Sequence, residues 1–347
     1  MLKQRASRSI PASVVHALSR APGPLVLAVS GGLDSMALLH MVRRRAGIRT
    51  RSCVATFDHA TGPHATEAVE LVRSTARRYG IPVVSGRARR RAASESEWRN
   101  MRWEFLSKVA AQRGATLVTA HTRDDQIETV VMRVLRGAGA RGIAALYAES
   151  PIVRPLLRTS RQALERYAAA HRLKHAEDPS NTNRRYLRNR VRHDLLPAIR
   201  SVQPEFERSI LRLSREAAEL RRRAESVAVS VSVLIAEQLW VDAAALGRLD
   251  RAAIAVLWPA IVARLGPALD RRGIVRATDF ALRSRSGQQA QCTGLTLKRV
   301  GDTIIVARQS SVTRGSRVWE NGTLRGNVLS AAGVSHAAVA VNTNEAG

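Results

Sequence analysis

The sequence predicts an α/β protein, in which a parallel sheet with helices on both faces precedes a mainly helical region that ends in a β-hairpin. Two observations predict this fold class. From residue 25 to about residue 160, short apolar runs alternate with amphipathic stretches, the pattern of parallel strands joined by helical crossovers. Beyond that point an Arg-rich helical pattern replaces the strands. Open parallel sheets bind ligands beyond the carboxyl ends of their strands, so functional motifs are expected there.

In the first region, apolar runs predict the strands and amphipathic stretches with end signals predict the helices. Ser94 and Glu97, for example, have the spacing of a capping box and predict a helix start. Gly80 and Pro82 predict the end of an earlier helix. The expected strands are 25–30, 53–57, 81–85, 117–120 and 152–156, and the expected helices are 34–45, 64–79, 94–114 and 124–136.

The second region begins with a basic connector, because residues 154–192 contain eleven Lys or Arg and three acidic residues. One long helix is expected over 204–226 and two more within 250–285. Gly301-Asp302 separates two apolar runs and predicts a hairpin of strands 295–300 and 303–307. The expected division is a basic N-terminal extension (1–22), an α/β domain with the connector (23–200), a helical domain with the hairpin (201–310) and a disordered tail (311–347).

The composition favours a soluble protein with a polyanionic partner. Lys and Arg number 56 against 28 Asp and Glu, a formal charge of +28, which attracts nucleic acid. A general preference for Arg on the surface is the alternative explanation. The two cysteines are far apart, which argues against a zinc ribbon, an iron–sulfur cluster or a disulfide scaffold. No apolar run is long enough for a membrane span and no signal peptide is apparent, so a cytoplasmic location is expected.

A glycine-containing loop follows the first expected strand. We call residues 30–35 the phosphate loop; it reads Ser30, Gly31, Gly32, Leu33, Asp34, Ser35. The glycines permit a tight turn whose N–H groups point into one concavity beside a helix N-terminus. Asp34 would repel a bare phosphate, so a Mg²⁺ ion is expected between them. No Lys follows the glycines, which excludes a Walker A loop. An ordinary Gly-Gly turn capped by Asp34 is the alternative.

A second motif follows the fourth expected strand and starts at His121. Asp125 and Glu128, which we call the acid pair, are three residues apart on the first turn of a helix, so their carboxylates share a face. Two adjacent carboxylates favour a bound cation, either a metal ion or an alkyl ammonium. The alternative is that both acids complement the positive end of the helix dipole.

The phosphate loop resembles that of the N-type ATP pyrophosphatases, which cleave ATP between the α and β phosphates. Their members include GMP synthetase, NAD synthetase, tRNA thiolases and lysidine synthases. The resemblance implies a Rossmann-like fold of the adenine nucleotide alpha hydrolase type, ATP as cosubstrate, a loop that binds the departing pyrophosphate, and a substrate that receives AMP.

The second motif is similar to that of the tRNA(Ile)-lysidine synthase family. The matching residues are His121 with Asp125, Gln126 and Glu128, and the run from Arg136 to Gly139. The resemblance implies that the acid pair holds the substrate lysine and that Asp58, His59 and His121 lie beside the nucleotide. It also aligns Arg99 and Arg102 with arginines that would neutralise phosphate charge in the transition state. Trp98, Trp103 and Thr61-Gly62 depart from the family pattern, which leaves the choice between the two arginines open.

The basic connector also resembles this family, and the likeness covers residues 24–200. The residues implied to contact tRNA are Arg188, Asn189, Arg190 and Arg192. Arg188 and Arg192 are four residues apart and are expected to form a ridge for phosphates, with a solvated basic helix face as the alternative.

The resemblance implies a ligase that joins L-lysine to C2 of the wobble cytidine in an isoleucine tRNA with a CAU anticodon. An adenylated cytidine is the intermediate, and the lysidine formed changes the codon read from AUG to AUA. Asp125 and Glu128 are both candidates for the base that takes the proton of the amine. Three rivals are a tRNA thiolase, an amidotransferase-type synthetase, and an RNA-binding protein with a degenerate loop. The oligomeric state stays open, with a homodimer among the alternatives.

Overall fold

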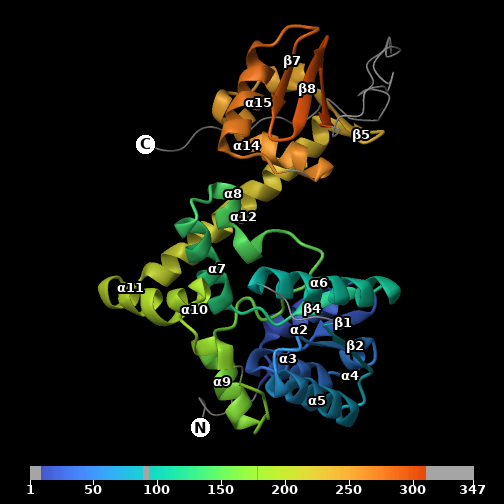
Figure 1. The fold of residues 1–347 in the computed structure, drawn as a ribbon, viewed down its shortest axis with the longest axis vertical. Coiled ribbons are helices and arrows are strands. Elements are labelled where there is room, and N and C mark those ends of the chain that lie inside the picture. Colours follow the sequence, from blue (N-terminus) through green and yellow to red (C-terminus); the bar gives the residue numbers. More distant parts are fainter. Residues whose placement is uncertain (1–8, 89–93, 178, 267, 310–347) are drawn as a thin grey trace. The chain divides into compact units, whose positions relative to one another are not determined.

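The computed structural model describes residues 9–88, 94–177, 179–266 and 268–309. The chain divides into two compact units, residues 1–218 and 219–347, and each is described by itself (Figure 1). The tail expected over 311–347 lies outside the described residues.

Unit 1 is built on a four-stranded parallel sheet. Its strands are β1 (Leu25–Ala28), β2 (Ser52–Asp58), β3 (Val83–Arg87) and β4 (Thr116–Thr119), in the order β3-β2-β1-β4. β2, the next strand in the chain, pairs with β1 on one side. β4, the last of the four strands, pairs with β1 on the other side. The strand order reverses between β1 and β4, and this switch point is where such sheets bind ligands. The phosphate loop and the second motif follow these two strands.

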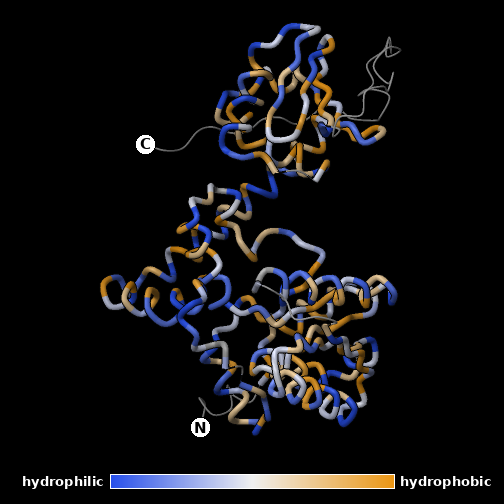
Figure 2. Tube along the Cα trace, in the orientation of Figure 1, coloured by the Kyte–Doolittle hydropathy of each residue, from blue (hydrophilic) through white to orange (hydrophobic). Residues whose placement is uncertain are grey.

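Helices cover both faces of this sheet, as predicted (Figure 1). One face packs against α3 (Leu33–Arg43) and α5 (Pro63–Arg78), where the buried side chains of β1 meet those of α3 in the main core. The other face packs against α6 (Glu95–Gln112) through Leu106 and Val109. Because both faces are covered, β1 reads Leu-Val-Leu-Ala without alternation, and Figure 2 shows the hydrophobic residues gathered in this part of unit 1.

The expected fifth strand, 152–156, is a correction. Within this segment only Val153 pairs with the sheet, through a bridge to Val118 of β4. Pro151 and Pro155 flank this position, and a proline has no N–H to donate to a strand ladder. The two prolines therefore prevent the pairing from extending beyond Val153 in either direction.

The remaining helical segments of unit 1 surround the carboxyl edge of the sheet and its main core. In the extension expected over 1–22, Val14 and Leu18 of α2 are fully or almost fully buried in that core. A smaller core joins α7 to α11 and to the start of α12. These segments are α2 (Ala12–Arg20), α4 (Ala46–Arg49), α7 (Arg123–Leu135), α8 (Ala140–Ile143), η1 (Ala145–Tyr147), α9 (Arg161–Ala170), η2 (Pro179–Thr182), α10 (Leu187–Arg190), the π-helix η3 (Val191–Leu195), α11 (Leu196–Val202) and the first half of α12 (Phe206–Ser230).

Unit 2 combines helices with a five-stranded antiparallel sheet in the order β5-β6-β9-β8-β7. The predicted hairpin is confirmed as β8 and β9 joined at Gly301-Asp302, and α12, α14 and α15 match the expected helices. Trp258 of α14 is fully buried at the centre of the core between helices and sheet. The elements are α13 (Ala243–Gly247), α14 (Arg251–Val262), η4 (Ala263–Leu265), α15 (Arg271–Arg283), β5 (Ser232–Ile235), β6 (Gln238–Asp242), β7 (Gln289–Cys292), β8 (Leu295–Val300) and β9 (Thr303–Arg308).

Strands β5, β6 and β7 were not expected, which is a second correction. The turn between β5 and β6 consists of Ala236 and Glu237, whose φ angles are 46° and 61°. Two-residue hairpin turns with positive φ at both positions usually contain Asn or Gly, and neither is present here. The usual sequence signal for this hairpin is therefore absent, and the strands themselves have only four or five residues.

Candidate active site at the carboxyl edge of the parallel sheet

The phosphate loop turns sharply between β1 and α3. Gly31 has φ +90°, and a Cβ there would lie 3.1 Å from the side chain and carbonyl of Ala68, so only glycine fits without strain. The Ser35 hydroxyl accepts from the Ser30 N–H at 3.2 Å and donates to the Gly32 carbonyl at 2.9 Å. The Ala176 N–H donates to the Gly31 carbonyl at 2.9 Å. The loop is thus held in shape before any ligand binds.

Asp34 lies on the first turn of α3 and is largely buried. Its pKa is raised to about 6, chiefly by burial and also by the nearby carboxylates of Asp125 and Asp124, and the charges of Arg161 and Arg192 oppose this rise. Its Oδ1 atom is buried and has no hydrogen-bond partner among the residues that the structure describes, while Oδ2 lies 3.7 Å from Arg161 Nη1. A buried carboxylate oxygen without a donor is a suitable ligand for a hard cation.

The carboxylates near the phosphate loop fit Mg²⁺ only in part. Within the described residues no group of three or more His, Cys, Asp or Glu side chains is placed to hold a metal ion. Asp34 would therefore share the ion with oxygens of a bound phosphate and with water, which is how Mg²⁺ is usually bound beside nucleotides.

The first turn of α7 positions the acid pair. Thr122 caps the helix, and Asp125 Oδ2 accepts from the Thr122 N–H at 2.8 Å and from its hydroxyl at 2.9 Å. Burial would raise the pKa of Asp125, but Arg188 and the bonds from Thr122 outweigh burial and lower it. Asp125 therefore completes a capping box and also presents a charged oxygen, Oδ1, to a cation.

Two guanidinium groups occupy the acid pair. Arg188 donates from Nη2 to Asp125 Oδ1 at 2.6 Å and from Nε to Glu128 Oε2 at 2.8 Å. Arg192 donates from Nε to Glu128 Oε1 at 2.5 Å and from Nη2 to Oε2 at 3.0 Å. Only 2% of Glu128 is exposed, so these bonds replace water around its carboxylate. Both carboxylates of the acid pair are therefore paired with arginines of the protein itself.

The basic connector is oriented differently from the expected ridge. Arg188 and Arg192 point toward α7 and their side chains are 28% and 22% exposed. Asn189 is buried and donates from Nδ2 to the Asn183 carbonyl at 2.9 Å. Of the four residues expected to contact tRNA, Arg190 alone is exposed.

His121 and Arg102 lie beside the acid pair. The pKa of His121 is lowered to about 4, chiefly by burial and also by the charges of Arg154, Arg188 and Arg102, and Asp125 opposes this. The imidazole is therefore neutral at pH 7, and its Nδ1 lies 2.7 Å from the Thr119 hydroxyl.

Arg99 and Arg102, which the sequence did not distinguish, differ in placement. Burial lowers the pKa of Arg102, and the charges of Arg99 and Arg188 lower it further. Arg102 Nε is buried without a hydrogen-bond partner within the described residues, whereas Arg99 is exposed. Arg102 is thus the one turned toward the site.

Asp58 is the last residue of β2, and His59 follows it at the same edge. Asp58 is 4% exposed, and it accepts from the Ala60 N–H at 2.7 Å and the Thr66 hydroxyl at 3.0 Å. The His59 ring packs edge-on against Phe57, with 5.1 Å between ring centroids. Asp58 therefore shapes the turn that carries His59.

Arg161 is a site residue that the sequence analysis missed. Its backbone N–H donates to Asp124 Oδ2 at 2.8 Å, and its guanidinium lies 3.7 Å from Asp34. It thereby links the phosphate loop, α7 and α9. The available signal was Ser160, which caps α9 and places Arg161 at its first position, but this signal does not show what the helix end faces.

Comparison with known proteins identifies a family and several relatives of this chain. Residues 4–199 match the family model described as the PP-loop domain. Curated relatives include proteins named tRNA(Ile)-lysidine synthase from Burkholderia mallei, 38% identical over 232 residues covering 61% of this chain and 46% of the relative, and from Geobacter sulfurreducens, 36% identical over 239 residues covering 64% and 50%. The chain spans about half the length of the curated relatives it matches.

A solved structure has a similar fold. It is the U34-tRNA thiolase from Methanococcus maripaludis, which aligns with a TM-score of 0.50 at 16% identity and covers 62% of this chain and 78% of the thiolase. At this identity the likeness concerns the fold alone.

Proposed function

Because the chain belongs to the PP-loop domain family, we propose that it is an ATP-dependent ligase that modifies tRNA. Its substrates are L-lysine, ATP and an isoleucine tRNA with a CAU anticodon. The product carries lysidine at the wobble position, and AMP and pyrophosphate are released. The names of the curated relatives support this assignment, and the chain is 35–38% identical to them over 199–239 residues.

The occupied acid pair is the observation that carries the proposal. Asp125 and Glu128 bind two guanidinium groups at the edge of the sheet that also bears the phosphate loop. A site for an organic cation beside a site for pyrophosphate is what the ligation of an amine to an adenylated base requires. The ε-ammonium and α-ammonium groups of lysine are cations of the same charge as those already bound.

The first step transfers AMP to the base. O2 of the cytidine attacks the α-phosphate of ATP, and pyrophosphate leaves into the phosphate loop, where backbone N–H groups and the Ser30 hydroxyl receive it. Mg²⁺ bound at Asp34 would neutralise phosphate charge. Arg102 is placed to stabilise negative charge beside the acid pair, and its buried Nε supports this role.

The second step forms the new C–N bond. The neutral ε-amine of lysine attacks C2 of the adenylated cytidine, the C2–O2 bond to AMP breaks, and AMP leaves with O2 on its phosphate. The amine must lose protons to a base. The lowered pKa of Asp125 suits it to hold an ammonium rather than to accept a proton.

The test is a reaction of the purified chain with ATP, labelled lysine and unmodified tRNA transcript. We expect label in the RNA and one AMP released per lysine incorporated. The Asp34→Asn variant should incorporate none. Incorporation that is unaffected by Asp34→Asn would contradict the assignment of the phosphate loop, and AMP release without lysine incorporation would contradict the ligase.

The thiolase rival requires a reactive cysteine. Cys53 and Cys292 are both buried, and burial raises the pKa of each thiol, so neither is a ready nucleophile. The double variant Cys53→Ser, Cys292→Ser should keep full lysine-dependent activity. Loss of activity in a variant with an unchanged unfolding temperature would favour sulfur transfer.

The proposed partners set the location and the assembly to be tested. No helix within the described residues is both long and apolar enough to cross a membrane. Free lysine, ATP and tRNA meet in the cytoplasm, where we expect the protein to act. The homodimer remains a prediction, and light scattering at several protein concentrations tests it.

A further inference from the structure

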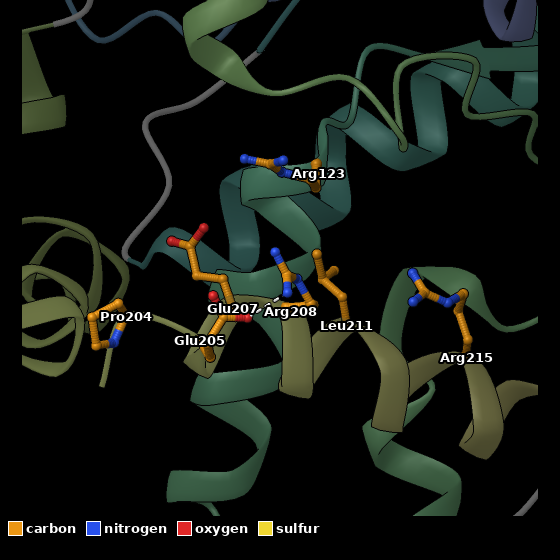
Figure 3. A pocket seen from close by; sticks show the side chains of 7 residues that line it. All are labelled: Arg123, Pro204, Glu205, Glu207, Arg208, Leu211 and Arg215. Atoms are coloured by element: carbon orange, nitrogen blue, oxygen red, sulfur yellow. Dashed lines mark ion pairs between the residues drawn. The ribbon is translucent and has the colours of Figure 1, made fainter. Parts of the chain in front are cut away.

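A cavity of about 300 Å³ lies next to the first turn of α7, within unit 1 (Figure 3). We call it the α7 cavity. Arg123, the first residue of α7, lines one part of it, and Leu211 and Arg215 of α12 line another. Figure 3 shows the two arginines entering from these different helices.

The carboxylates of the α7 cavity already have cationic partners. Glu205 pairs with Arg208 at 2.8 Å, and Glu207 pairs with Arg200 at 2.5 Å. Arg123 and Arg215 form no ion pair with any carboxylate in the described part of the chain. Two uncompensated guanidinium groups therefore remain, and they favour an anionic ligand.

Arg123 carries a further indication of a ligand. Its Nε atom is buried without a hydrogen-bond partner among the described residues. A buried donor without an acceptor costs about 1–3 kcal/mol, and an anion oxygen in the α7 cavity would remove this cost.

The position of the α7 cavity identifies the class of anion. Arg123 belongs to the same first turn of α7 as Asp124 and Asp125, so the cavity lies at the end of the helix that carries the acid pair, on a side of that helix which Asp125 does not face. The ATP phosphates have the phosphate loop, which follows a different strand. We propose that the α7 cavity binds a backbone phosphate of the RNA, next to the nucleotide whose base is modified, and this inference rests on the proposed function. Guanidinium groups bind phosphates with two parallel hydrogen bonds and thereby fix the position of an RNA strand.

The test compares RNA binding by Arg123→Gln, Arg215→Gln with that of a matched control. Arg212→Gln removes a charge from the same helix, and the Arg212 side chain is 72% exposed and does not line the cavity. Affinity for the unmodified tRNA transcript is measured by fluorescence anisotropy between 50 and 300 mM KCl. We expect the double variant to bind at least about tenfold more weakly and to reduce the slope of log Kd against log salt by about 0.7–0.9, the value for one phosphate contact.

Each outcome has a defined meaning. A similar loss in Arg212→Gln, or no loss in the double variant, contradicts the phosphate site, and thermal unfolding of all three proteins identifies a variant that has lost its fold. If the double variant has lost its fold, RNA affinity is measured instead for the single variants Arg123→Lys and Arg215→Lys, which keep the charge. Unchanged RNA affinity in both contradicts the phosphate site. A raised KM for ATP with unchanged RNA affinity would assign the anion to the nucleotide instead.

The phosphate site and the proposed function fail separately. If the wild-type chain incorporates lysine while the double variant binds RNA normally, the function stands and the phosphate site is wrong. If the wild-type chain binds RNA in the arginine-dependent way but incorporates no lysine, the phosphate site stands and the ligase is wrong.

Discussion

Replacing Glu128 by Gln removes one charge from the most completely buried carboxylate of the site. Glu128 is 2% exposed and accepts three hydrogen bonds of 2.5–3.0 Å from Arg188 and Arg192. Glutamine keeps the size of the side chain but leaves two guanidinium groups with Asp125 as their remaining acidic partner. Breaking a buried ion pair on one side typically costs 3–5 kcal/mol, and because both arginines are partly exposed we expect about 3 kcal/mol.

Calorimetry measures this loss as a shift in Tm. Unit 1 contains residues 1–218, and an unfolding entropy of about 2.1 cal/mol/K per residue gives about 0.46 kcal/mol/K for the unit. A loss of about 3 kcal/mol then lowers Tm by about 6–7 °C. The matched control is Glu216→Gln, because Glu216 is 64% exposed and lies 4.0 Å from Arg212. An exposed pair of this kind contributes at most about 1 kcal/mol, so its Tm should move by about 2 °C or less.

Equal shifts for the two variants would refute the reasoning. They would show that losing Glu128 costs no more than losing an exposed carboxylate, so that its buried ion pairs do not stabilise unit 1. Hydrogen exchange of the α7 amides provides a second readout, because loss of protection should be confined to Glu128→Gln.

Three further predictions concern the stability of the Asp34→Asn variant, the pH dependence of lysine incorporation and the conformation of Gly31. Folding raises the pKa of Asp34 to about 6, so its contribution to stability is present at pH 4 and lost as the pH rises through 6. Asp34→Asn should therefore raise the free energy of unfolding at pH 8 by at most about 3 kcal/mol and show no such gain near pH 4. Urea titrations at both pH values measure the two gains, and equal gains would contradict the prediction. Lysine incorporation by the wild-type chain should fall as the pH drops through about 6, because the ionised form is needed to bind Mg²⁺; a rate that stays flat from pH 8 to 5 would exclude this. Gly31→Ala should cost about 1–3 kcal/mol and raise the KM for ATP, because of the φ of +90° and the contact with Ala68, whereas Gly47→Ala, where a Cβ meets nothing within 4 Å, should leave the KM unchanged.

The parallel sheet was largely predictable from the sequence, and the reason is physical. Its strands are buried on both faces, so they appear as apolar runs, and the helices between them carry end signals such as the Ser94 cap, which the structure confirms. The sheet of unit 2 was mostly missed because its strands are short and its first turn lacks the residues that mark such turns. One turn signal, Gly301-Asp302, was used and the hairpin it predicts was confirmed. Gly294, which lies with φ +74° in the two-residue turn between β7 and β8, was a second signal that the sequence analysis did not use.

The components of the site were predictable, but the directions of its arginines were not. A strand followed by a glycine turn, and two acids three residues apart, each define a local geometry that neighbouring residues fix. Arg188 and Arg192 are different, because a long side chain on a short helix can face either a phosphate or a carboxylate. Their choice depends on α7, which precedes them by about 60 residues and contributes a carboxylate that is too buried to remain unpaired. The sequence therefore predicted a bound cation at the acid pair, and the fold determines that arginines of the protein itself are bound there.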